Sequence, residues 1–170
     1  MSDSQHRPQE GEKSKESKPR PLGLVKIDEV ARRWVSAPDD MPAKAYKAIC
    51  EGAVRVTKFS KPRCEFQFTV VEGDYTGVCL PGWAEMKYIG AKRIKPGCHY
   101  ERYCKIALNG DLPDDLDPRL FIGKVFIVET AYRRTNGKSR ILLDATRKKD
   151  ATDHLRVVDI VSLSLKSLIS

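Results

Sequence analysis

The chain has 170 residues, of which 41% are hydrophobic, and it carries a formal net charge of +8 at pH 7. This length fits one domain with a sizeable core and is short for two ordinary domains. No stretch stays apolar over the roughly 20 residues that a membrane span requires, so we expect no membrane protein.

Residues 1–21 contain no Leu, Ile, Val, Phe, Tyr or Trp. Such a segment buries too little apolar surface to offset its ordering entropy, so we predict a disordered tail. Its charges supply only +1 of the formal +8. The remaining charge belongs to residues 22–170, where it can form a patch that attracts an anionic polymer.

The five cysteines are an odd number, and the first residues contain no apolar signal segment. We therefore expect reduced cysteines in a cytoplasmic protein, with no disulfide framework.

Apolar residues recur at helical spacing between Ile27 and Trp34, which predicts a short helix. Residues 39–42, Asp-Asp-Met-Pro, then indicate a linker. Residues 22–44 are thus expected to form a helix and linker, and residues 45–170 to form a binding domain.

Three strands are predicted in succession after residue 45. The first covers about 45–56, with Gly52 as a bulge, and the second covers 64–70, where apolar and polar residues alternate strictly. The third covers 75–80, and Pro81-Gly82 is predicted to stop it.

Residues 98–108 have apolar residues at helical spacing and predict a helix. A fourth strand is predicted around 125–130 and a fifth at 140–143, joined by a turn at 135–138 that contains Asn-Gly. The segment 155–169 fits both a strand and a helix, and the sequence leaves that choice open.

The predicted fold class is mainly β, a β-rich α+β domain. The element order is that of a five-stranded OB-like barrel with a helix between strands 3 and 4. In that fold the binding cleft crosses strands 2 and 3, between the loop joining strands 1 and 2 and the loop joining strands 4 and 5.

Both of these loops are basic. Residues 55–63 and residues 132–140 each contain four basic residues, no acidic residue and one aromatic residue. Cations that follow phosphates and rings that stack on bases are what a single-stranded nucleic-acid groove requires. We add Trp83, just after the third strand, and predict these binding residues: Arg55, Lys58, Phe59, Lys61, Arg63, Trp83, Tyr132, Arg133, Arg134, Lys138 and Arg140.

The sequence contains no motif for nucleotide hydrolysis or dinucleotide binding. Cys98, His99 and Cys104 come nearest to a metal cluster, but residues 98 and 104 face different sides of a helix, and their role stays open. The aspartates within 111–117 are expected to cap or solvate a turn, although a metal-dependent enzyme built on them is a third alternative. We expect no enzyme, no metal and no cofactor.

Residues 95–130 include a Pro-Gly-led helix and the segment Phe-Ile-Gly-Lys-Val-Phe at 121–126. Together with the strand-turn-strand at 65–80, they resemble small OB-fold, single-stranded-DNA-binding-like accessory proteins of phages and integrated mobile elements. The resemblance covers about half of the chain and implies an accessory role in DNA replication or recombination.

The function expected from the sequence is non-catalytic binding of single-stranded nucleic acid, with DNA preferred and replication proteins as possible partners. The alternative is a protein-interaction adaptor in a replication or conjugation complex, docking through the helix around Trp34 or through the C-terminal element. The sequence does not distinguish DNA from RNA, and it gives neither the oligomeric state nor the host process.

Overall fold

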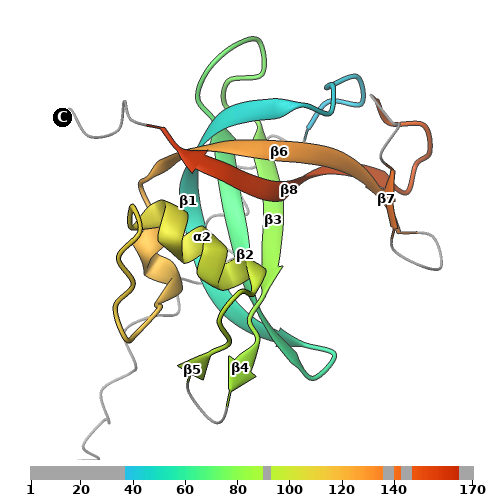
Figure 1. The fold of residues 1–170 in the computed structure, drawn as a ribbon. Coiled ribbons are helices and arrows are strands. Elements are labelled where there is room, and N and C mark those ends of the chain that lie inside the picture. The colour runs from blue at the N-terminus through green and yellow to red at the C-terminus, as the bar shows by residue number, and fades with distance from the viewer. Residues whose placement is uncertain (1–36, 90–92, 136–139, 143–146, 165–170) are drawn as a thin grey trace, which may run out of the picture. The chain divides into compact units, whose positions relative to one another are not determined.

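The computed structural model describes residues 37–89, 93–135, 140–142 and 147–164 (Figure 1). The chain divides into two units, Met1–Arg33 and Trp34–Ser170, and all described residues belong to the second. The predicted tail at 1–21 and the predicted helix within 22–35 lie outside the described residues.

The first three long strands form an antiparallel meander: β1 (Ala45–Lys58), β2 (Lys61–Val70) and β3 (Cys79–Glu85). The predicted strand is confirmed as β2, and Cys64, Phe66, Phe68 and Val70 are all buried, although Gln67 between them is buried as well. The register of β1 against β2 shifts between Cys50 and Gly52, which confirms the predicted bulge.

The prediction for the third strand was wrong at both ends. It begins at Cys79 instead of Tyr75, and it continues through Pro81-Gly82 to Glu85. Gly82 is needed for close approach, because a Cβ atom there would lie 3.1 Å from the Cβ atom of Val157 on a neighbouring strand. A glycine that looked like a strand stop therefore makes room for another strand.

That neighbour is β8 (Asp153–Leu163), which pairs in parallel with β3 at Gly82 and Val157 and antiparallel with β6 (Val125–Arg134). The sheet order is β1-β2-β3-β8-β6-β7, and β6 also pairs with β1. Each of the strands β1, β2, β3, β8 and β6 therefore pairs with the next, and the last of them, β6, pairs with β1 again (Figure 1).

The predicted fifth strand at 140–143 is described as β7 (Arg140–Leu142), a hairpin partner of β6, and Leu143 lies outside the described residues. The segment whose type the sequence left open is a strand over Asp153–Leu163. Its β-branched residues favour this outcome, because a strand between β3 and β6 packs branched side chains well.

The predicted helix at 98–108 is confirmed as α2 (His99–Ala107), which buries Tyr100, Tyr103, Cys104 and Ala107. It follows a small two-stranded sheet, β4 (Tyr88–Ile89) and β5 (Arg93–Ile94), and it precedes the 3-10 helix η1 (Pro118–Phe121) and then β6. Figure 1 shows α2 beside β8, with which it is in contact.

Aromatic side chains dominate the core. Phe66 meets Phe121 with ring centres 4.9 Å apart, and Phe68 meets Phe126 at 6.2 Å. Met41, in the segment expected to be a linker, is fully buried in this core. All five cysteines are buried, and none forms a disulfide. Within the described part of the chain, no helix has the length and apolar character needed to cross a membrane.

Candidate nucleic-acid interface

Three arginines from three strands converge on the ring of Trp83 in β3. The guanidinium carbons of Arg156, Arg63 and Arg133 lie 4.8, 5.4 and 5.5 Å from the ring centre. All three distances are within the range of cation–π attraction. We call these four residues the arginine–tryptophan cluster.

Strand register explains why these residues meet. Trp83 lies opposite Glu65, and Arg63 is two residues before Glu65, so both side chains of β2 share the face of Trp83. On the other side, Val157 pairs in parallel with Gly82, so Arg156 lies on the same face of the sheet as Trp83 and reaches its ring diagonally. The cluster therefore depends on the pairing of β3 with both β2 and β8.

Arg133 joins from β6. It lies opposite His154 of β8, which is two residues before Arg156 and therefore on the same face. Arg133 also has a further interaction in addition to its contact with Trp83. Partial desolvation, together with the charges of Arg156 and Arg133, lowers the pKa of His154, which disfavours its charged form beside the cluster.

Arg156 is the most deeply buried member, with 8% of its surface exposed. Within the described residues it forms no ion pair with a carboxylate, and its buried Nε has no hydrogen-bond partner. Burial, and then the nearby Arg133 and Arg63, lower its pKa to about 10. A buried charge without a counter-charge is costly, and an anion bound at the cluster would offset that cost.

The Nε atom of Arg63 is likewise buried without a partner. Only three buried side-chain nitrogen or oxygen atoms lack a partner in the described chain, and two of them are in this cluster. The terminal nitrogen of Arg63 donates to Glu65, which also pairs with Lys58 at 2.9 Å. Although partial burial acts to raise the pKa of Glu65, the hydrogen bonds from Lys58 and Arg63 lower it.

The tip of the β1–β2 hairpin carries the predicted Phe59, which is 94% exposed. Lys58 and Lys61 pair directly across the two strands beneath it. Phe59 and Ser60 have φ angles of 51° and 60°, in the left-handed region. The tip thus presents an aromatic ring to solvent above two lysines.

Arg55 does not join the cluster. It lies opposite Cys64 in the register, whereas Arg63 lies opposite Val56, so the two arginines occupy different faces of the hairpin. The guanidinium of Arg55 instead lies 5.6 Å from the ring centre of Tyr88.

Arg134 is held in an ion pair. Its Nε donates to Asp153 at 2.8 Å, and its second contact to the same carboxylate is 3.1 Å. Asp153 also accepts backbone N–H groups of Lys149 and Asp150. The hydrogen bond from Arg134 is the largest of the effects that lower the pKa of Asp153 to about 2. This arginine therefore fixes the segment that leads into β8.

Tyr132, predicted to stack on a base, is only 1% exposed. Its hydroxyl donates to the backbone carbonyls of Asp39 and Met41, at 3.2 and 2.9 Å. It offers no ring face to a ligand, because it packs in the core. Lys138 and the side chain of Arg140 lie outside the described residues, although the backbone of Arg140 pairs with Arg134 in β7.

Arg156 was missed by the sequence reasoning, which looked for basic residues in loops. Its signal is an arginine between the apolar residues Leu155 and Val157, in a segment whose other charged residue is Asp159. A buried charge in a strand of this kind is either paired or placed for a ligand, and Asp159 pairs with Arg102 instead.

The described residues contain no group of three or more His, Cys, Asp or Glu side chains that could hold a metal ion. Cys98 and Cys104 are buried, while His99 is exposed. In the aspartate-rich loop, Asp117 accepts the backbone N–H of Arg119 and pairs with its guanidinium, so it caps η1 as the sequence suggested.

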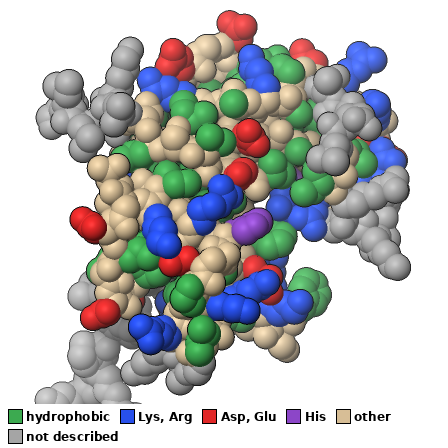
Figure 2. Space-filling model, in the orientation of Figure 1, with side chains coloured by type: hydrophobic (Ala, Val, Ile, Leu, Met, Phe, Trp, Pro, Cys, Tyr) green, Lys and Arg blue, Asp and Glu red, His purple; other side chains and the backbone are tan. Residues whose placement is uncertain are grey.

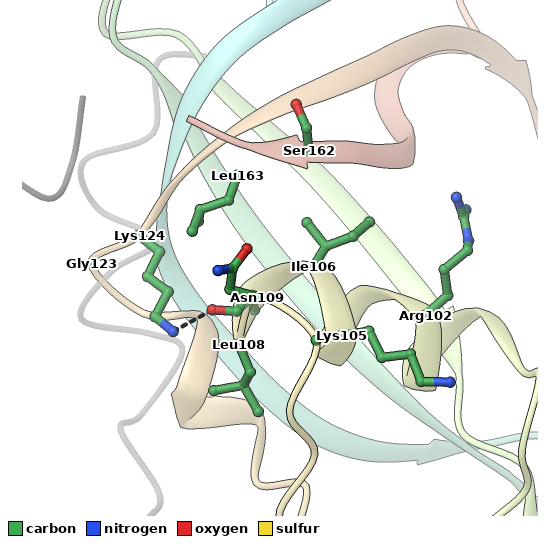
Figure 3. Close-up of a pocket in the computed structure, with 11 residues that line it drawn as sticks. Arg102, Lys105, Ile106, Leu108, Asn109, Gly123, Lys124, Ser162 and Leu163 are labelled. Carbon is green, nitrogen blue, oxygen red and sulfur yellow. Dashed lines mark hydrogen bonds between the residues drawn. The ribbon is translucent and has the colours of Figure 1, made fainter. Parts of the chain in front are cut away.

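A groove of about 910 Å³ lies elsewhere, between the C-terminal half of α2, Gly123-Lys124 and the end of β8 (Figure 3). The ammonium of Lys124 donates to the carbonyl of Ala107 at 2.6 Å. The other two cations of the groove are paired, Arg102 with Asp159 and Lys105 with Glu101. These cations have partners already, which distinguishes the groove from the arginine–tryptophan cluster.

Figure 2 shows basic side chains across the middle and lower parts of one face of the molecule and also along its upper and right edges, with acidic side chains interspersed. No protein-family model matches this chain, and comparison with curated proteins and with solved structures finds no significant match. The case for a function therefore depends on the described side chains.

Proposed function

We propose that this chain binds single-stranded nucleic acid, with DNA preferred, through the arginine–tryptophan cluster. The observation that carries the proposal is the convergence of three guanidinium groups on Trp83, two of which have a buried Nε without a partner. Guanidinium groups are suited to phosphate because they remain charged and donate several hydrogen bonds in a fixed geometry.

The pairing pattern supports an OB-type barrel as the framework of the proposed site. Its five strands would be β1, β2, β3, β6 and β8, since their pairings return to β1 and β3 pairs in parallel with β8. Such folds bind oligonucleotides across their second and third strands. Arg63 and Trp83 belong to those two strands.

Trp83 has a different role in this proposal from the one that its sequence position suggested. Its ring is contacted by three guanidiniums, so we assign it to holding the arginines near one another. The arginines then contact phosphates, and their planar groups can stack on bases. We propose that this binding serves an accessory role in DNA replication or recombination.

The test measures binding to labelled single-stranded and double-stranded oligonucleotides by fluorescence anisotropy at a series of salt concentrations. We expect single strands to bind more tightly, and binding to weaken steeply from about 50 to about 200 mM salt. Replacing one phosphate-contacting arginine reduces the salt slope by about 0.7 on single strands. Salt-independent binding, or no binding to single strands, would contradict the proposal.

A protein-interaction adaptor is the second candidate, and the groove in Figure 3 favours it. Its walls include the apolar side chains of Ile106, Leu108 and Leu163, next to three cations. Capture of a replication protein that survives nuclease treatment and is lost in Ile106→Glu would support this alternative. Loss of all captured protein after nuclease treatment would oppose it.

A further inference from the structure

The hairpin tip combines two features that folding alone does not favour. Phe59 is 94% exposed, so its ring gains almost nothing from packing. Both Phe59 and Ser60 adopt positive φ angles, where Asn and Gly are the usual residues of a two-residue hairpin. Strain kept at an exposed aromatic residue indicates a contact with a ligand.

The tip and the arginine–tryptophan cluster lie along the same face of the β1–β2 hairpin. Lys61, Arg63 and Glu65 alternate along β2 and share one face. Lys58 is opposite Lys61 and pairs with Glu65, so it lies on that face too. A basic path therefore leads from the cluster to Phe59.

The length of this path follows from strand geometry. Trp83 lies opposite Glu65, which is five residues from Ser60 at the tip. At about 3.4 Å per residue, the separation along the strand is about 17 Å. A strand stacked as in B-form DNA covers about 17 Å in about five nucleotides.

We infer that the cluster holds a phosphate of a nucleic-acid strand while Phe59 stacks on a base of the same nucleic-acid strand. The site then has two contact points, and only an oligonucleotide of a minimum length reaches both. This inference rests on the proposed function. It adds that short oligonucleotides reach only one of the two points, whereas strands longer than about six nucleotides reach both. A nucleic acid is favoured over a membrane surface because a single phenylalanine side chain is a small apolar anchor, and lysines and arginines continue behind it.

The experiment measures the affinity of the whole chain for thymidine oligonucleotides from about 2 to about 16 nucleotides long. We expect a step of about 10-fold in affinity once the strand spans both points, beyond the gradual rise that added charge produces. Phe59→Ala should remove this step, and Phe59→Trp should keep it and report binding through a change in fluorescence.

Val71→Ala is the matched control, because Val71 is an exposed apolar residue just beyond the opposite end of β2. It should leave the step unchanged. Circular dichroism should show all variants folded, since neither side chain is buried.

Failure of the inference can be distinguished from failure of the proposed function. Long oligonucleotides that bind without a step in affinity, or with a step that persists in Phe59→Ala, would overturn the two-point site. The cluster would remain a binding site in either case. If no strand binds at any length, the proposed function itself fails. Phe59-dependent binding to phosphatidylserine vesicles, without any effect on oligonucleotides, would overturn the inference in favour of a membrane contact.

Discussion

The guanidinium carbon of Arg156 lies 4.8 Å from the ring centre of Trp83, and this contact joins β8 to β3 beside the parallel pair of Gly82 and Val157. Because Arg156 is almost fully buried and has no carboxylate partner within the described chain, its charge costs stability in the unbound protein.

We therefore expect Arg156→Met to be at least as stable as the parent protein, since it replaces a buried unpaired charge with an apolar side chain of similar length. The same variant should bind single strands at least 10-fold less tightly, roughly the effect of losing a charge-assisted hydrogen bond. Thermal unfolding and anisotropy titrations measure the two effects. A variant that melts earlier and binds normally would show that Arg156 is structural.

Arg133 and Arg134 are adjacent in the sequence but should behave differently. Arg133→Ala should weaken binding by about 10-fold with a small effect on the melting temperature, because Arg133 lies over Trp83. Arg134→Ala should mainly lower the melting temperature, because it removes the guanidinium that pairs with the buried Asp153 carboxylate. Each variant serves as the control for the other. Equal loss of binding in both, with unchanged stability, would contradict this division.

The sequence predicted these elements most accurately where its hydrophobic period was unambiguous. Strict alternation identified β2, and the spacing of Tyr100, Tyr103, Cys104 and Ala107 identified α2. The segment of β8 fits both periods; its β-branched residues favour a strand, and its position between β3 and β6 selects one. Local sequence does not contain that information, because the partners are distant along the chain.

The candidate site was less predictable than the fold. Basic residues in loops led to Arg63 and Arg133, which the sheet brings to the ring of Trp83, but the same reasoning included Arg134, which forms an ion pair with Asp153, and Tyr132, which is in the core. Those pairings connect residues on different elements, so composition alone does not reveal them. Arg156 was missed because a single arginine in a strand is not a charge cluster until the sheet brings others beside it.

At the strained hairpin tip, we expect residues that favour folding stability to differ from the residue that favours binding. Ser60→Gly should raise the free energy of unfolding by about 1 kcal/mol, since glycine adopts positive φ without the steric cost that other residues bear. Phe59→Gly should stabilise by a similar amount but lose the length-dependent step in affinity. Chemical denaturation measures stability in both variants. A Ser60→Gly variant that is less stable than the parent would contradict the strain argument.

Acid unfolding should depend on Asp153. The hydrogen bond from Arg134 contributes most to lowering its pKa from 3.8 to about 2, so the ionised form is favoured in the folded state. For a carboxyl group with a lowered folded-state pKa, this stabilisation is complete above its ordinary pKa and is lost as the pH falls towards the folded value.

Asp153→Asn is the corresponding variant. We expect it to be less stable than the parent near neutral pH, and the difference to shrink as the pH falls from 3.8 to about 2. Urea midpoints measured across this interval provide the test. A difference that stays constant across the interval would show that this carboxylate does not gain stability from its charge.

The position of β8 also determines what an incomplete chain would expose. This strand pairs with β3 on one side and β6 on the other, and those partners are far from it in the sequence. A polypeptide that ends before Asp153 would leave one edge of β3 and one edge of β6 without a partner strand. Exposed strand edges recruit other chains, so aggregation is the expected fate of truncated products and a hazard of slow closure during synthesis.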